Sequence, residues 1–230
     1  ILKLWGVDLE ICSIKLDGQE LGDDVYSYVD QRLTITSVPI EPFVLETCCR
    51  IDPYNNSSLE GLYASGGLLS TQCEAEGFRR ITFHPDRPDV LSRWTVRIEA
   101  SRVSCPVMLS NGNAIAEEEL GDGRHAVTWE DPYPKPSYLF ALVAGDLREI
   151  RDQFTTASGR VVTLRLHVEE GDEPYTAHAM ASLKRSMAWD EKVYQLEYDL
   201  DEYNIVAVRH FNMGAMENKS LNIFNSKLVL

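Results

Sequence analysis

The chain alternates apolar and polar positions in short runs up to about residue 146, and then changes character. The clearest run is RWTVRIEA, residues 93–100, where Trp94, Val96, Ile98 and Ala100 fall on one face and charged or hydroxyl residues fall on the other. A period of two residues predicts a strand with one buried and one wet face, as in an antiparallel sheet. Further strands are expected at residues 12–16, 32–38, 43–51, 79–83, 107–110, 125–129 and 137–145.

The proline-rich segment EDPYPKPSY, residues 130–138, interrupts this series. Proline lacks the N–H group that a central strand donates to its neighbours. We therefore expect the segment to cross between sheets rather than to pair within one.

Beyond residue 146 the pattern predicts strands and one long helix. Met180, Leu183, Met187 and Tyr194 recur at helical spacing within residues 173–197, which predicts a helix with one apolar stripe. The remaining apolar runs predict strands at residues 154–159, 161–170, 203–211 and 221–230.

Composition narrows the class of protein. The 230 residues include 36 acidic and 22 basic side chains, for a formal charge of -14, which repels phosphate backbones and argues against nucleic acid as a partner. No apolar run approaches the roughly 20 residues that cross a bilayer, so no membrane association is expected. The five cysteines are odd in number and two are adjacent, which favours a reducing compartment and a cytoplasmic location.

A search for a complete active site from the residues alone fails. The five histidines form no i,i+4 pair and no HExxH, and the chain carries no GxSxG, Walker or GxGxxG motif. No catalytic residue and no metal ligand is therefore expected in this chain.

One candidate stretch is SGGLLSTQCEAEGFRR, residues 65–80. Glu74 and Glu76 alternate with small residues in an apolar context, and carboxylates in such a place need cationic partners. The alternative is that both decorate a solvated strand face beside Arg79 and Arg80.

The second candidate stretch is NMGAMEN, residues 212–218. Gly214 and Ala215 allow another backbone to approach closely, and Glu217 supplies a negative charge. Met213 and Met216 would supply adaptable apolar surface. The alternative is a hairpin turn with one exposed glutamate.

The pentapeptide GAMEN, residues 214–218, resembles the signature of the M1 family of zinc aminopeptidases. The stretches TQCEAEGFRRITF, PDRPDVLSRWTV, LSNGN, WEDPYPKPSYLFALVAGDL and HAMASLKRSMAWDEKVY, in this order, are similar to the bacterial aminopeptidase N branch of that family. The similarity runs over essentially all of the chain from about residue 30 onward.

This resemblance implies a mainly β fold with two parts. Residues 1–146 would form an N-terminal antiparallel β saddle or sandwich domain that lacks its first strands. Residues 147–230 would form the beginning of a thermolysin-like α+β catalytic domain, with strands and one long helix, that stops before the HExxH motif.

The resemblance also implies a site. In the family, the GAMEN segment is an edge strand along which the substrate backbone lies extended, and the carboxylates of Glu74 and Glu217 would hold the α-ammonium group of the peptide. Gln72 matches a neighbouring contact, and Met213 matches a cushion beneath the first side-chain pocket. The expected substrate-binding residues are Gln72, Glu74, Met213, Gly214, Ala215, Met216, Glu217 and Asn218.

The catalytic parts of the family lie downstream of this chain. One zinc ion, its ligands, the general base and a tyrosine would belong to the parent enzyme, so this piece alone is expected to be inactive. Its expected partners are peptides with a free N-terminus and the remaining catalytic and helical domains of the parent.

The chain departs from the family pattern at three positions. Arg209 and His210 stand where an acidic residue is common before Phe-Asn-Met, and Ser220 replaces a glycine.

Two other functions compete with that of an aminopeptidase. One alternative is a non-catalytic acidic β-rich module that binds peptides. The epoxide hydrolase branch is disfavoured, because it tends to carry a second glycine where this chain has Ala215.

Overall fold

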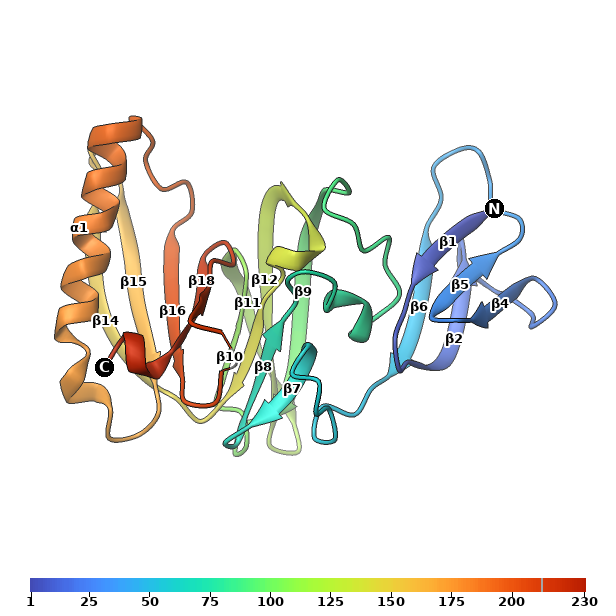
Figure 1. The fold of residues 1–230 in the computed structure, drawn as a ribbon, viewed down its shortest axis with the longest axis horizontal. Coiled ribbons are helices and arrows are strands. Elements are labelled where there is room, and N and C mark those ends of the chain that lie inside the picture. The colour runs from blue at the N-terminus through green and yellow to red at the C-terminus, as the bar shows by residue number, and fades with distance from the viewer. Residues whose placement is uncertain (212) are drawn as a thin grey trace. The chain divides into compact units, whose positions relative to one another are not determined.

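The computed structural model describes residues 1–211 and 213–230, and it divides into two compact units (Figure 1). Unit 1 comprises residues 1–64, 71–92 and 135–140. Unit 2 comprises residues 65–70, 93–134 and 141–230. The boundary expected at residue 146 falls inside unit 2 and stays a prediction.

Unit 1 is built on two small antiparallel sheets with the strand orders β1-β5-β4 and β3-β2-β6. Apolar residues at alternate positions of these strands form its core, because alternate side chains of a strand share a face. The core residues are Leu4, Leu9, Ile14, Leu33, Ile35 and Phe83. The strands are β1 Leu2–Trp5, β2 Glu10–Leu16, β3 Gln19–Glu20, β4 Tyr26–Val29, β5 Arg32–Ile35 and β6 Leu45–Arg50.

Two strands carry the chain across the boundary between the units, β7 Gly61–Ser65 and β8 Leu68–Gln72. The prediction of a strand at residues 79–83 is wrong. The chain forms the 3-10 helix Phe78–Arg80 there, because the N–H of Gly77 donates to the carbonyl of Cys73 and turns the backbone. Phe78 is buried and packs edge-on against the Phe140 ring.

Unit 2 begins with β-sheet structure in the orders β10-β13-β8 and β11-β12-β9. Strand β9 alternates half-buried and exposed side chains along its whole length, as predicted. The crossing expected at residues 130–138 is only partly right, because β12 continues through Lys135 and pairs with β11 as far as Glu130. The strands are β9 Ser92–Ser101, β10 Val107–Ser110, β11 Asn113–Gly121, β12 Arg124–Lys135 and β13 Leu142–Gly145.

The rest of unit 2 is a five-stranded sheet in the order β14-β15-β16-β18-β17. β15, β16 and β18 run parallel, while β14 and β17 are antiparallel to their neighbours and form the two edges. The strands are β14 Arg148–Thr155, β15 Val161–Val168, β16 Glu202–Val208, β17 Ala215–Met216 and β18 Leu221–Asn225.

Helix α1 Ala177–Tyr194 lies along one face of this sheet, beside β14 and β15 (Figure 1). Met180, Leu183 and Met187 are buried against the apolar residues of β15 and β16, which confirms the predicted stripe. Tyr194 is 61% exposed, so its assignment to that stripe is wrong. The helix also starts later than expected, since the 3-10 turn Glu173–Tyr175 precedes it.

The last predicted strand is shorter than residues 221–230. β18 ends at Asn225, whose side-chain oxygen accepts a hydrogen bond of 3.1 Å from the N–H of Lys227. This contact starts the 3-10 turn Ser226–Leu228. In the part of the chain that the structure describes, no helix has the length and apolar character of a membrane span.

Candidate functional site

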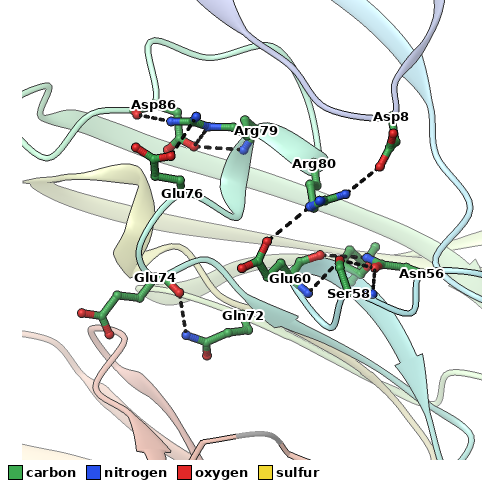
Figure 2. A network of polar contacts seen from close by, with 11 residues as sticks. Asp8, Asn56, Ser58, Glu60, Gln72, Glu74, Glu76, Arg79, Arg80 and Asp86 are labelled. Carbon is green, nitrogen blue, oxygen red and sulfur yellow. Dashed lines mark hydrogen bonds and ion pairs between the residues drawn. The ribbon is translucent and has the colours of Figure 1, made fainter. Parts of the chain in front are cut away.

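The first candidate stretch forms a turn at the end of β8, within unit 1. Gln72 is buried, and its amide donates a hydrogen bond of 3.3 Å to the backbone carbonyl of Glu74. Gly77 closes the turn, and a Cβ atom there would lie 2.4 Å from the carbonyl oxygen of Gln72. Figure 2 shows the Glu74 side chain pointing away from the neighbouring polar network. The turn therefore presents an exposed carboxylate on a fixed backbone.

A buried ion pair supports this turn from behind (Figure 2). Asp86 is 2% exposed and accepts hydrogen bonds from the backbone N–H and the Nε of Arg79, at 3.2 and 2.9 Å. The hydroxyl of Ser137 donates to the other oxygen of Asp86, at 2.5 Å. Two partners on one carboxylate fix the position of the residues that follow the turn. Sequence reasoning missed Asp86, because nothing local distinguishes it from a surface aspartate.

Glu74 and Glu76 take different roles. The carboxylate of Glu76 forms an ion pair with Arg79 at 3.0 Å, although its side chain is 69% exposed. Within residues 1–211 and 213–230, no salt bridge involves Glu74. Of the two carboxylates, Glu74 is therefore the one that is available to a cationic ligand.

The second candidate stretch contributes the edge strand β17 of the five-stranded sheet in unit 2. Ala215 is paired with Phe224, and Met216 with Ile223. The carbonyl of Gly214 accepts a hydrogen bond of 2.9 Å from the N–H of Asn225. Hydrogen-bonded and non-hydrogen-bonded pairs alternate in an antiparallel ladder, so Ala215 belongs to a non-hydrogen-bonded pair. Its own N–H and C=O consequently point to the open edge of the sheet.

The residues of this stretch differ in exposure. Met213 is 43% exposed, and Gly214 and Glu217 are also exposed. Met216 and Asn218 are each 1% exposed. The expectation that Met216 offers apolar surface is therefore wrong, because its side chain is part of the protein interior. Asn212, the first residue of this stretch, lies outside the described residues.

Glu217 lines a cavity of about 540 Å³ between α1 and the sheet. Three further carboxylates line the same cavity, those of Asp190, Glu197 and Asp199. Lys219 balances one of them through an ion pair with Asp199 at 2.8 Å. Burial raises the pKa of Tyr203, also in the lining, to about 12, so this phenol stays neutral. The cavity thus combines an excess of negative charge with an apolar wall, which favours a cationic group.

A loop from the neighbouring part of unit 2 holds the end of the GAMEN segment. The side chain of Asn111 donates to the carbonyl of Lys219 and accepts from the N–H of Ala141, both at 2.8 Å. The hydroxyl of Ser220 accepts from the N–H of Gly112 at 2.5 Å. Asn111-Gly112 is a dipeptide typical of turns, but the sequence gives no sign that Lys219 and Ser220 are its partners.

The two residues before the GAMEN segment that depart from the family pattern are both at the surface. Arg209 forms ion pairs with Asp172 at 2.8 Å and with Glu169 at 3.5 Å. The backbone carbonyl of His210 accepts a hydrogen bond of 3.3 Å from Ser65. Arg209 thus ties the chain before β17 to the connection between β15 and α1. His210 ties it to the end of β7.

Histidine and acidic residues do not assemble into a metal site in this part of the protein. Among the described residues no three His, Cys, Asp or Glu side chains are grouped as metal ligands would be. His167 is hydrogen-bonded to Asn204 at 3.0 Å, and His125 to the carbonyl of Cys105 at 2.8 Å. The described residues therefore offer no donor set for zinc.

Comparison with known proteins decides the family. Residues 46–139 match the Peptidase M1 N-terminal domain, and residues 178–230 match the Peptidase family M1 domain. The chain belongs to peptidase family M1. The predicted family and the mainly β fold are confirmed, and residue 146 lies between the two matched ranges.

The similarity to relatives in this family extends over the whole length of this chain. Aminopeptidase N of Caulobacter vibrioides is 57% identical and aminopeptidase N of Escherichia coli is 54% identical, each over 229 residues. The crystal structure of Legionella pneumophila aminopeptidase A in complex with aspartic acid matches with a TM-score of 0.96 and 36% identity. The match covers all of this chain and 26% to 27% of each relative, so the chain spans about a quarter of their length.

Proposed function

We propose that this chain is the substrate-binding part of a zinc aminopeptidase that hydrolyses the N-terminal residue from peptides. The observation that carries the proposal is the open edge of β17, where the backbone N–H and C=O of Ala215 point outward. A peptide that adds to this edge as a further strand gains main-chain hydrogen bonds whatever its side chains are. Gly214 has no side chain to obstruct that approach.

Each unit offers one exposed carboxylate for the free N-terminus of the peptide, Glu74 in unit 1 and Glu217 in unit 2. Glu74 and Glu217 are both exposed, and no salt bridge in residues 1–211 and 213–230 involves either. A carboxylate gives an ammonium group charge-assisted hydrogen bonds that it cannot give to an internal amide. The two residues would therefore restrict cleavage to the chain end.

Three further residues would contribute to substrate binding within their own units. Gln72 donates to the carbonyl of Glu74, and Asn218, which follows Glu217 in the chain, is buried. Met213 is partly exposed beside the edge strand and would form a soft cushion for the first side chain of the substrate.

Hydrolysis itself belongs to the parent enzyme. The zinc ion would supply the polarised carbonyl and the activated water there, and its ligands, the general base and a tyrosine would lie outside this chain. This piece alone would bind peptides without cleaving them. Its partners would be the remaining domains of the parent, and its location the cytoplasm.

The test replaces Glu74 and Glu217 singly by alanine in the full-length protein and measures kcat/KM for aminoacyl p-nitroanilides. Loss of one charge-assisted contact to the ammonium group costs about 2 to 5 kcal/mol, which lowers kcat/KM by about 30-fold to 4,000-fold. Glu76→Ala is the matched control, because Glu76 lies in the same turn but pairs with Arg79. It should change kcat/KM by less than about threefold.

Wild-type rates in both variants would overturn the site assignment. A full-length protein that binds peptide N-termini but releases no amino acid would instead support the non-catalytic binding module.

A further inference from the structure

Two of the five cysteines, Cys12 and Cys48, lie on paired strands at the surface of unit 1. All five are free thiols, but they differ in accessibility. Cys12 and Cys48 are exposed, Cys49 is half-buried, and Cys73 and Cys105 are buried. Only the first two are therefore open to solvent on neighbouring strands.

The strand register explains how these two thiols meet. β2 pairs with β6 so that Ile11 lies opposite Cys49 and Ser13 opposite Cys48. The register shifts between Ile11 and Ser13, which makes Cys12 the additional residue of a β-bulge. A bulge places its extra side chain next to the residue across the ladder, and here that residue is Cys48.

The chemistry around the pair agrees with direct contact. Partial desolvation and the neighbouring Cys48 thiol both raise the pKa of Cys12. An ion pair between Glu10 and Arg50, at 2.7 Å, joins the same two strands. Glu10 lies two residues before Cys12 in β2, and Arg50 lies two residues after Cys48 in β6. The guanidinium of Arg50 acts in the opposite direction on the pKa of Cys12, because a nearby cation favours the thiolate.

We propose that Cys12 and Cys48 form a redox site that reacts with low-molecular-weight disulfides such as oxidised glutathione and closes into an intramolecular disulfide. A disulfide needs Cα atoms about 4.4 to 6.8 Å apart, and residues on neighbouring antiparallel strands meet that condition. The bond would staple β2 to β6, the edge strand of its sheet.

The reaction balances as two thiol–disulfide exchanges. The thiolate of one cysteine attacks a sulfur of oxidised glutathione, forms a mixed disulfide and releases one glutathione thiolate. The thiolate of the second cysteine then attacks the protein sulfur of that mixed disulfide and releases the second glutathione. The protein loses two protons and two electrons, and one oxidised glutathione becomes two reduced molecules.

Other pairings are disfavoured by the strand geometry. Cys48 and Cys49 are adjacent in β6, so their side chains point to opposite faces. Cys49 packs against the core of unit 1, away from the exposed face that carries Cys12.

The experiment equilibrates the full-length protein with mixtures of reduced and oxidised glutathione, blocks the remaining thiols by acid quench and alkylation, and maps tryptic peptides by mass. Trypsin leaves Cys12 in residues 4–15 and both Cys48 and Cys49 in residues 33–50. We expect a linked peptide lighter than the sum of its parts by two hydrogen atoms. Its fraction should depend on the square of the reduced glutathione concentration divided by the oxidised concentration, as an intramolecular disulfide requires.

Single serine variants identify the partners. Cys12→Ser and Cys48→Ser should abolish the linked peptide and leave a glutathione adduct on the remaining exposed cysteine, while Cys49→Ser should form the linked peptide as the wild type does. The proposal would be overturned by two glutathione adducts and no linked peptide in the wild type. It would equally be overturned by a linkage that survives Cys48→Ser and disappears in Cys49→Ser, or by no change at any glutathione ratio.

Discussion

The hydroxyl of Ser220 accepts a hydrogen bond of 2.5 Å from the backbone N–H of Gly112, a residue 108 positions earlier in the chain. Ser220 is 2% exposed and has a φ of +62°, in the left-handed region that favours glycine. Ser220 therefore combines an unfavourable backbone conformation with a buried polar contact. That contact ties the end of the GAMEN segment to the loop at Asn111-Gly112.

Two substitutions at Ser220 separate these effects. Ser220→Ala keeps the left-handed backbone but leaves the buried N–H of Gly112 without its acceptor, which should lower the free energy of unfolding by about 1 to 3 kcal/mol. Ser220→Gly loses the same bond but removes the strain, so it should be more stable than Ser220→Ala by about 1 kcal/mol. Urea denaturation of both variants measures the difference. Equal stability of Ser220→Ala and the wild type would show that the bond contributes nothing.

Gly112 should tolerate no side chain at all. A Cβ atom at this position would lie 1.9 Å from the carbonyl oxygen of Glu130, far inside van der Waals contact. Gly112→Ala should therefore destabilise the protein by more than about 3 kcal/mol, because the backbone of β12 cannot move away without breaking its ladder. Thermal unfolding followed by circular dichroism measures the effect.

Gly159 provides the matched control for Gly112. Its φ of +89° is close to the +94° of Gly112, but nothing lies within 4 Å of the Cβ position. Gly159→Ala should thus cost only the backbone strain, about 1 kcal/mol. If both alanine variants melted at the same temperature, the close approach to Glu130 would not be what requires a glycine at 112.

The local hydrophobic pattern predicted most strands and the helix of this fold. It could not predict contacts between segments that are distant in the sequence. The alternation in β9 and the buried stripe of α1 follow from side-chain periodicity alone, and both were predicted. The 3-10 helix Phe78–Arg80 was read as a strand, because its residues are held by Asp86 and by aromatic packing rather than by a period-two pattern. The burial of Met216 could not be predicted either, because it follows from the pairing of β17 with β18 rather than from the local sequence.

The candidate site shows the same division between local and distant information. The residues themselves pointed to Glu74, Glu217 and the permissive Gly214 and Ala215, and the resemblance to the family supplied the role expected of the two glutamates. Neither the resemblance nor the local sequence could predict the buried residues that hold these segments in place. Asp86 and Ser137 meet across 51 residues of sequence, and only the folded chain brings them together.

The ion pair between Arg79 and Asp86 should contribute much more to stability than the pair between Arg79 and Glu76. The Asp86 side chain is 1% exposed, whereas that of Glu76 is 69% exposed. Asp86→Ala leaves the Arg79 guanidinium without its buried partner, which should lower the free energy of unfolding by about 3 to 5 kcal/mol. Glu76→Ala should cost less than about 1 kcal/mol, because solvent screens an exposed pair.

Urea denaturation of the two variants compares the pairs through one shared arginine. Losses of similar size would contradict the assignment of Asp86 as the support of the turn that carries Glu74.

The stability of the protein should fall as the pH drops below about 6.5, and His167 should be one cause. Burial lowers the pKa of His167 in the folded protein, and the hydrogen bond to Asn204 only partly opposes this effect. Below the ordinary histidine pKa of about 6.5, the unfolded chain takes up a proton that the folded chain refuses. The stabilisation is therefore complete above that pH and is lost as the pH falls toward the folded pKa, by at most about 1.4 kcal/mol per pH unit.

Charged groups near His167 modify this dependence. Glu149 raises the pKa of His167 and Arg165 lowers it. Glu202, which is paired with Arg165 at 2.8 Å, has its own pKa raised by burial, so its proton uptake in the folded state opposes the loss as the pH falls. Burial also lowers the pKa of His84, which adds to the loss.

His167→Gln isolates the contribution of the histidine. The glutamine amide can still donate to the side-chain oxygen of Asn204, but it does not titrate. Between pH 6.5 and pH 5, the free energy of unfolding should fall less steeply in the variant than in the wild type, while Glu202 and His84 act equally in both. Urea denaturation at half-unit pH steps measures the two slopes. Identical slopes would mean that His167 is protonated equally well in the folded and unfolded states, against the burial that the fold imposes on it.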